Sequence, residues 1–153
     1  MGQFVFYETE DLKDEEIWLE LLRTMPEDPA RGLVPAYYFK IRSRKTNEAV
    51  GMCDLRVGNR YNIYYAGNIG YQVYERFRGR HYASRACRLL FRQAAKHGME
   101  EVVITCSTEN TASKRTCELA GAVCVETVKV PSDNEMYKRG YRLLHRYVKR
   151  LKM

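Results

Sequence analysis

The stretch Tyr74–Ala86 constrains the fold most, because it joins a predicted strand to a predicted helix through one glycine. The strand, Gly67–Val73, has apolar residues at every second position, which is the period of a half-buried strand. The helix, Gly79–His97, carries an apolar stripe at three- and four-residue steps, formed by Ala83, Ala86, Cys87, Leu90 and Ala94. This succession predicts a loop that presents the start of a helix at the end of a strand.

The start of this helix is suited to bind a diphosphate. A helix N-terminus has up to four unpaired N–H groups and the positive end of the dipole, so the amides from Gly79 to Ala83 fit a phosphate group. No acidic residue lies between Glu75 and Glu100, whereas the basic residues there are Arg76, Arg78, Arg80, Arg85, Arg88, Arg92 and Lys96. The charges alone also fit a solvated basic helix face, but together with the strand and the glycine turn they favour an anion site.

Two motifs in order resemble the GNAT superfamily of N-acetyltransferases. The sequence Arg76-x-x-Gly79-x-His81, followed by Tyr82-Ala83, is similar to the family's R/Q-x-x-G-x-G/A pyrophosphate loop. About thirty residues further on, Asn110-x-x-Ser113 followed by Gly121 is similar to its N-x-x-S…G helix. The resemblance covers roughly residues 48 to 125 and leans toward the ribosomal-protein N-terminal acetyltransferase branch.

The resemblance implies an α+β fold with a mixed, mostly antiparallel central sheet flanked by helices, and acetyl-CoA as cosubstrate. The pantetheine arm is expected on the backbone of Tyr71 and Val73, with an amide near Val73 facing the thioester oxygen. Asn110 fits a pantetheine amide, and an N-cap is the equal alternative. The residues expected at the diphosphate are Arg78, Gly79, Arg80, His81, Tyr82 and Ala83.

The sequence departs from the family pattern at two positions. His81 stands where glycine or alanine is preferred, so its side chain either hydrogen-bonds phosphate or packs aside. Cys117 stands where many members have a tyrosine that protonates the leaving thiolate. The resemblance then favours Ser113 as the catalytic proton donor, with helix capping or a cofactor contact as its alternative role. Tyr71 and Cys117 are further candidates.

The general base is not evident from the sequence. Gly70 falls near the position where many relatives carry a strand glutamate, so that base is absent. Glu75, Glu126 and the acidic N-terminal region remain as candidates, and any of them could act through a water. Surface carboxylates in loops are, as the alternative, simply solvated.

Length and composition set the remaining bounds. The chain has 153 residues, 45% of them hydrophobic, which predicts one domain over 1–153 without internal repeats. The resemblance implies that this is a single N-acetyltransferase domain. No secretory signal and no apolar run of membrane-spanning length is seen, so a cytoplasmic protein is expected. The five cysteines form no C-x-x-C pair and the three histidines are scattered, so we expect reduced thiols and no metal site.

The net charge of +7 is unevenly spread. Residues 1–30 hold two basic residues, Lys13 and Arg23, and nine acidic ones: Glu8, Glu10, Asp11, Asp14, Glu15, Glu16, Glu20, Glu27 and Asp28. If this region forms an acceptor wall, with Glu15 and Glu16 in it, a cationic primary amine is favoured. After Pro131 basic residues dominate, which fits either contact with RNA or an acidic partner, or an ordinary edge strand guarded by charge.

The pattern along the chain predicts the remaining elements. A helix is expected over Leu12–Met25, ended by the connection Pro26–Pro35. The helix Ala112–Ala120 is expected between the cap at Asn110 or Thr111 and Gly121. The predicted strands are Phe4–Tyr7, Ala36–Ser43, Val50–Val57, Ile63–Val73, Val102–Cys106, Val123–Val130 and Tyr141–Leu151.

These observations favour an acetyl-CoA-dependent N-acetyltransferase that transfers the acetyl group directly to a primary amine. The alternative is a CoA-binding sensor or interaction module with little catalysis, which the missing tyrosine and strand glutamate support. A nucleic-acid-binding domain is disfavoured because no such motif is present. No membrane partner is expected, and a homodimer is an open alternative.

Overall fold

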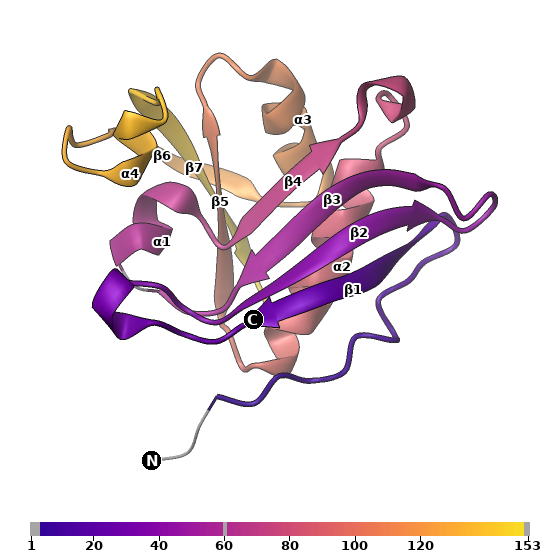
Figure 1. Ribbon diagram of the computed structural model, residues 1–153. Coiled ribbons are helices and arrows are strands. Elements are labelled where there is room, and N and C mark those ends of the chain that lie inside the picture. The colour runs from indigo at the N-terminus through magenta and orange to yellow at the C-terminus, as the bar shows by residue number, and fades with distance from the viewer. Residues whose placement is uncertain (1–3, 60, 152–153) are drawn as a thin grey trace.

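The computed structural model describes residues 4–59 and 61–151 and consists of two antiparallel sheets flanked by helices (Figure 1). The first sheet has the order β1-β2-β3-β4, with β1 at Ile17–Met25, β2 at Ala36–Ser43, β3 at Ala49–Arg56 and β4 at Ile69–Val73. The second has the order β5-β7-β6, with β5 at Glu101–Ser107, β6 at Val123–Lys129 and β7 at Leu143–Arg150. The helices are α1 (Tyr61–Ala66), α2 (Tyr82–Lys96), α3 (Thr111–Leu119) and α4 (Glu135–Lys138), with short 3-10 turns at Pro29–Arg31 and Glu75–Phe77. The predicted α+β fold with a mostly antiparallel sheet flanked by helices is confirmed.

Helix α2 packs its apolar stripe against one face of the first sheet. Ala86, Cys87, Leu90 and Ala94 of this stripe are fully buried. They share one core with sheet residues such as Tyr37, Phe39, Ile41, Val50 and Leu55. The opposite face of the sheet carries polar and charged residues, as is usual for an antiparallel sheet covered on one side only. In the described part of the chain, none of the helices is long and apolar enough to cross a membrane.

Asn68 joins the two sheets at a single point. Its backbone N–H donates to the Val103 carbonyl at 2.6 Å, and its side-chain oxygen accepts from the Val103 N–H at 2.8 Å. Its side-chain nitrogen donates to the carbonyls of Arg56 at 2.9 Å and Gly58 at 2.8 Å. Beyond this point β4 and β5 diverge toward their C-terminal ends (Figure 1).

The N-terminal region differs from its prediction. Residues 17–25 form the edge strand β1 rather than part of a helix over Leu12–Met25, and they pair with β2 from Ile17 opposite Ser43 to Met25 opposite Ala36. The carboxylate of Asp14 accepts from the amides of Glu16 and Ile17 at 2.7 and 2.9 Å, a local turn that starts the strand. The leucine spacing also fitted a helix, and pairing with β2 outweighed that local preference.

The strand predicted at Phe4–Tyr7 is also absent. This described segment is held by aromatic contacts instead, because Phe4 stacks on His97 with ring centroids 4.8 Å apart. The backbone N–H of Tyr7 donates to the Tyr37 hydroxyl at 2.9 Å, so it is satisfied without a partner strand.

Two further predictions need correction, and one helix was not predicted. The strand predicted over Ile63–Val73 is divided into α1 and β4, because Gly67 adopts a φ of 77° and donates to the Ile63 carbonyl at 2.8 Å. The C-terminal strand β7 lies between β5 and β6 and is therefore not an edge strand. Helix α4, whose first turn Asn134 caps through the Met136 N–H at 2.8 Å, was not predicted.

We expect the variant Asn68→Ala to lower the free energy of unfolding by about 3 kcal/mol, because it leaves several buried backbone groups without partners. Urea denaturation measures this loss. Asn62→Ala is the matched control: the Asn62 side chain makes one exposed hydrogen bond, to the Gly32 carbonyl at 2.9 Å, so its loss should stay within about 1 kcal/mol. Equal losses in the two variants would show that Asn68 has no special part in joining the sheets.

Candidate functional site

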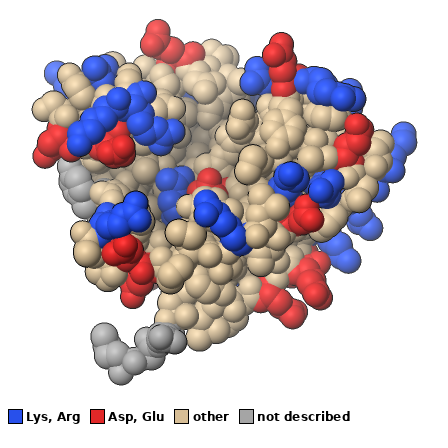
Figure 2. Space-filling model, in the orientation of Figure 1, with Lys and Arg blue, Asp and Glu red and all other residues tan. Residues whose placement is uncertain are grey.

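The divergence of β4 and β5 opens a cavity of about 910 Å³. Its walls come from β3, β4, the loop before α2, the end of β5, the start of α3 and the segment around α4. Figure 2 shows this face of the molecule hollowed between the part that carries α4 and the part that carries β4. The ten predicted cofactor-binding residues all line this cavity: Tyr71, Val73, Arg78, Gly79, Arg80, His81, Tyr82, Ala83, Asn110 and Ser113.

The loop before α2 has an unusual backbone. Gly79 and His81 both adopt left-handed conformations, with φ values of 85° and 63°. A left-handed φ costs a non-glycine residue energy, although histidine tolerates it better than most. The His81 side chain is exposed and places no capping hydrogen bond on the first turn of α2. The first backbone N–H groups of α2 are thus not capped by the His81 side chain, and a helix start that lines a cavity is suited to bind phosphate.

The basic run on α2 serves mainly to hold the N-terminal segment. Arg85 pairs with Asp14 at 3.0 Å and with Glu15 at 3.3 Å. Lys96 pairs with Asp11 at 2.6 Å, and Arg92 donates to the Asp11 carbonyl at 2.7 Å. For these residues the prediction of an anion site is wrong.

The acidic segment therefore lies against α2. Glu15 and Glu16 are not among the residues that line the cavity, so the predicted acidic acceptor wall is wrong as well. The C-terminal cation Arg146 is paired with Glu126 and also donates to the Tyr64 carbonyl at 3.0 Å.

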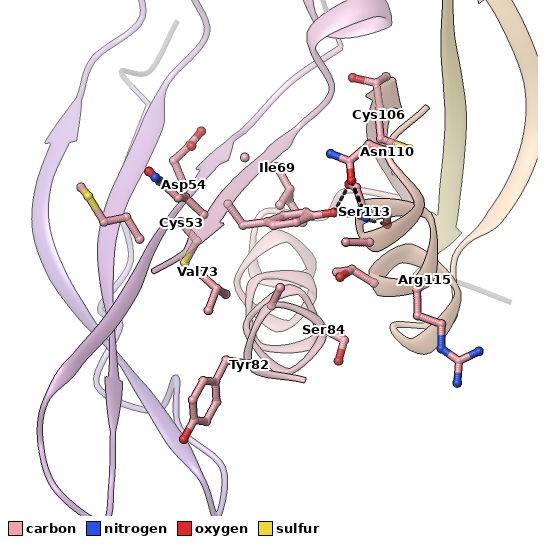
Figure 3. A pocket seen from close by; sticks show the side chains of 18 of the residues that line it. Cys53, Asp54, Ile69, Val73, Tyr82, Ser84, Cys106, Asn110, Ser113 and Arg115 are labelled. Atoms are coloured by element: carbon pink, nitrogen blue, oxygen red, sulfur yellow. Dashed lines mark hydrogen bonds between the residues drawn. The ribbon is translucent and has the colours of Figure 1, made fainter. Parts of the chain in front are cut away.

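Tyr71 and Ser113 meet across the cavity. The Tyr71 hydroxyl forms a short hydrogen bond with Ser113 Oγ, which ties β4 to α3 (Figure 3). Burial, together with the nearby Cys117 and Cys87 thiols, raises the pKa of Tyr71 far above its ordinary value. The hydroxyl is therefore neutral at all ordinary pH values.

The side-chain oxygen of Asn110 accepts from the Ser113 N–H at 3.0 Å, so Asn110 caps α3. The N-cap role, which was one of the two alternatives for Asn110, is thus present. The side-chain amide nitrogen of Asn110 takes no part in this cap. Cys106 at the end of β5 also lines the cavity, beside Cys117 of α3. Cys117 is fully buried, and its hydrogen bond to Cys106 and its burial raise its pKa, so it is a poor proton donor.

The structure adds two charged residues that the sequence did not single out. Asp54 and Arg56, both on β3, line the cavity, and Arg56 Nε lies 3.2 Å from Asp54 Oδ2. The sequence shows that these two residues alternate along the predicted strand. Their place opposite β4 depends on the strand register, which the sequence does not show. The base candidates taken from the sequence lie elsewhere: Glu126 accepts from the Tyr64 hydroxyl at 2.9 Å, and Glu75 lies in a 3-10 turn outside the lining. Within the described residues, no cluster of His, Cys, Asp or Glu is suited to hold a metal ion.

The fold places a loop at the start of α2 beside two diverging strands, β4 and β5. The sequence matches the model of a family of acyl-transfer enzymes. The model is that of the acetyltransferase (GNAT) domain, and it matches residues 2–123. The chain belongs to the GNAT acetyltransferase family. Among curated protein sequences, nothing matches this chain.

Solved structures share the fold. RimL, the ribosomal L7/L12 α-N-protein acetyltransferase, aligns in its apo form with a TM-score of 0.59 at 22% identity, covering 81% of this chain and 73% of that one. MccE, the microcin C7 self-immunity acetyltransferase in complex with acetyl-CoA and AMP, aligns with a TM-score of 0.59 at 18% identity over 75% of this chain. An enzyme from Salmonella typhimurium that modifies the N-terminal serine of ribosomal protein L7/L12 gives a TM-score of 0.58 at 22% identity, over 79% of this chain and 66% of that one. The chain spans only 61% of the MccE chain.

We expect His81→Gly to keep CoA affinity within about threefold, because backbone amides at a helix start bind phosphate and the His81 imidazole makes no capping hydrogen bond there. The variant His81→Val places a β-branched residue at a left-handed φ, so it should lose at least about 1 kcal/mol of stability and weaken CoA binding. Thermal unfolding and isothermal titration with CoA measure both effects. A large loss of affinity in the glycine variant would instead give the imidazole a direct role at the phosphate.

Proposed function

We propose that the protein transfers an acetyl group from acetyl-CoA to a primary amine by direct attack of the amine on the thioester. Membership of the GNAT acetyltransferase family supports the reaction class. The observation that carries the proposal for this chain is the cavity itself, which is lined both by the loop before α2 and by strand β4.

The diphosphate site is proposed at the start of α2. The left-handed Gly79 has open space where a side chain would be, so a phosphate can approach the backbone closely. Arg78 and Arg80 flank it, and the Arg78 side chain donates to the Val73 carbonyl at 3.3 Å. The two guanidinium groups place positive charge beside the amides.

The pantetheine arm is proposed to lie along β4. The Tyr74 N–H donates to the Val50 carbonyl on β3, and Asn68 accepts from Arg56, so even-numbered residues of this strand face β3. Because backbone groups alternate between the two edges of a strand, those of Tyr71 and Val73 face the gap toward β5. An extended amide chain can pair with this edge as an added strand would.

The proton for the leaving thiolate is proposed to come from Ser113. We assign the donor role in their hydrogen bond to the Tyr71 hydroxyl, which leaves the Ser113 hydrogen free to move to sulfur. The thioester oxygen faces a backbone amide near Val73, which stabilises the developing negative charge. Ser113 regains a hydrogen from water after each transfer, so both hydroxyls are neutral between transfers.

The acceptor is a primary amine. The solved relatives include an enzyme that modifies a protein N-terminal serine, which supports an amine at the end of a peptide. Because the acidic segment lies against α2, it gives no support for a preference for polycations. A module that binds CoA with little catalysis remains the second candidate, favoured by the cysteine that stands at position 117.

We expect CoA to bind and to raise the melting temperature. A ligand at a hundredfold excess over its Kd stabilises the native state by about 2.7 kcal/mol. Isothermal titration and thermal unfolding test this. Gly79→Val should abolish binding, because valine adopts a φ of 85° only with strain, whereas Gly98→Val, at the far end of α2 and also left-handed, is the matched control and should leave Kd unchanged. No binding at millimolar CoA would refute the proposal.

We expect Ser113→Ala to lower kcat by about 100-fold while the Kd of CoA changes less than threefold, as is typical for loss of a proton donor. Tyr71→Phe should produce a smaller loss of the same kind, because it removes only the hydroxyl that orients Ser113. Steady-state kinetics with detection of free CoA thiol, after subtraction of the protein's own thiols, gives both values. Full activity in Ser113→Ala would assign the proton donor to another group.

A further inference from the structure

A carboxylate lies where the missing side chain of Gly70 would be. Asp54 on β3 is directly opposite Gly70 on β4 in the register of the sheet. A Cβ atom added to Gly70 would lie 2.6 Å from Asp54 Oδ1 and 3.4 Å from its Cγ. Glycine at this position therefore leaves room for the carboxylate to reach over β4.

Asp54 is the only residue with a carboxylate among the described residues that line the cavity. It faces away from α2, because its neighbour Cys53 on the same strand points to the core beside Cys87. In Figure 3, Asp54 lies on the side of β4 that faces β3. Cys106, Asn110 and Ser113 lie on the other side of β4, toward α3. A group bound at the β4 edge thus has Asp54 on one side and the Ser113 hydroxyl on the other.

The surroundings of Asp54 suit a proton acceptor. Its side chain is 24% exposed, so water can reach it while much of its hydration is lost. Burial raises the pKa of the Asp54 carboxyl above its ordinary value, and the Arg56 guanidinium opposes part of that rise. Arg56 Nε is buried and makes no hydrogen bond within the described structure, so the ion pair is not a well-aligned one.

We propose that Asp54 is the general base of the reaction and the group that receives the ammonium of the acceptor; this rests on the proposed acetyl transfer. The acceptor enters as an ammonium ion and gives one proton to the Asp54 carboxylate. The neutral nitrogen then forms the N–C bond to the thioester carbon, and the C–S bond breaks. The nitrogen loses its second proton to water, and the thiolate gains one from Ser113. Ser113 regains a hydrogen from water and Asp54 returns its proton to water, so that one proton is released in all.

Other titratable groups share the cavity with Asp54. Tyr38 on β2 lies opposite it in the sheet register, with the Arg23 guanidinium 4.6 Å from the ring centre of that tyrosine. Arg139 and Tyr141 come from the segment around α4, and His81 from the loop before α2. Of these, only histidine ordinarily titrates near neutral pH. A test by pH must therefore separate Asp54 from His81.

The test is the pH profile of kcat/KM for Asp54→Asn, measured with acetyl-CoA and a panel of a serine-initiated peptide, an alanine-initiated peptide, lysine and spermidine. We expect a fall of about 100-fold or more at pH 7 and loss of the acidic limb of the profile. Glu20→Gln is the matched change on the same sheet outside the cavity. This variant should keep both the wild-type kcat/KM at pH 7 and the acidic limb of the profile. His81→Gly should keep the acidic limb of the profile even if the value of kcat/KM changes.

Stability and CoA binding serve as structural controls. Because the folded-state pKa of Asp54 is raised, its ionised form costs stability at neutral pH, and this cost fades as the pH falls toward the ordinary carboxyl range. Asp54→Asn should therefore not lower the melting temperature at pH 7, and its Kd for CoA should match the wild type within about twofold, since a base is not needed to bind CoA. A drop in both would mean that Asp54 only shapes the cavity, and would overturn the assignment.

A relocated carboxylate gives the sharpest result. Asp54→Ala opens the space over β4, and the added change Gly70→Asp puts a carboxylate back from the other strand. We expect the double variant to be at least about tenfold more active than Asp54→Ala. No recovery, or an Asp54→Asn variant within threefold of wild type with its acidic limb intact, would overturn the base assignment while leaving acetyl transfer in place. No acetylation of any amine by the wild type would overturn both.

Discussion

One buried asparagine holds three strands together, and the cavity opens where two of them, β4 and β5, diverge beyond it in the described structure (Figure 1). Asn68 is 2% exposed and uses its backbone and side chain to bind β3, β4 and β5 at one level. Gly67 makes this approach feasible, since a Cβ there would lie 3.0 Å from the Val103 carbonyl oxygen. β4 is the last strand in the order of the first sheet, so past this level its outer edge has no partner strand, and the Arg78 side chain donates to the Val73 carbonyl there. An unpaired edge is ordinarily a hazard, but here it faces an interior cavity, where a ligand amide rather than another chain can pair with it.

Local ion pairs along α2 say more about the charges of this protein than its net charge does. The acidic start of the chain runs beside the basic face of α2, and ion pairs such as Asp14 with Arg85 join the two. The pKa of Asp14 is lowered: burial acts against ionisation, but the amides of Ile17 and Glu16 and the Arg85 guanidinium outweigh it. With those cations paired, Arg78 and Arg80 are the basic residues left at the mouth of the loop. Both residues line the cavity beside the start of α2, where a diphosphate is proposed to lie.

The parts of the site that depend on backbone could be predicted, and those that depend on strand register could not. The loop from Arg78 to Ala83 is set by a glycine, a helix start and local spacing, all of which are visible in sequence. Asp54 required knowledge that β3 pairs with β4 so that residue 54 meets residue 70. The same gap explains the error at Ile17–Met25, where leucines at helical spacing concealed an edge strand whose pairing with β2 decides its conformation. The periodicity of apolar residues shows which face a segment could bury as a helix or as a strand. The element against which the segment packs or pairs decides which of the two it forms.

The arrangement also explains how acid and base chemistry can share one small cavity. β4 is a thin divider: Cys53 and Tyr71 lie on its core side, and Gly70 leaves its other side to Asp54. On the α3 side, burial holds Tyr71 neutral and its hydrogen bond orients Ser113. On the β3 side, partial exposure and Arg56 keep Asp54 able to ionise. Two environments that push proton affinities apart are what an enzyme needs to accept one proton and donate another within a single encounter. In this chain a single glycine on β4 makes that separation compatible with a reaction centre at the strand edge, since any side chain at position 70 would displace the carboxylate.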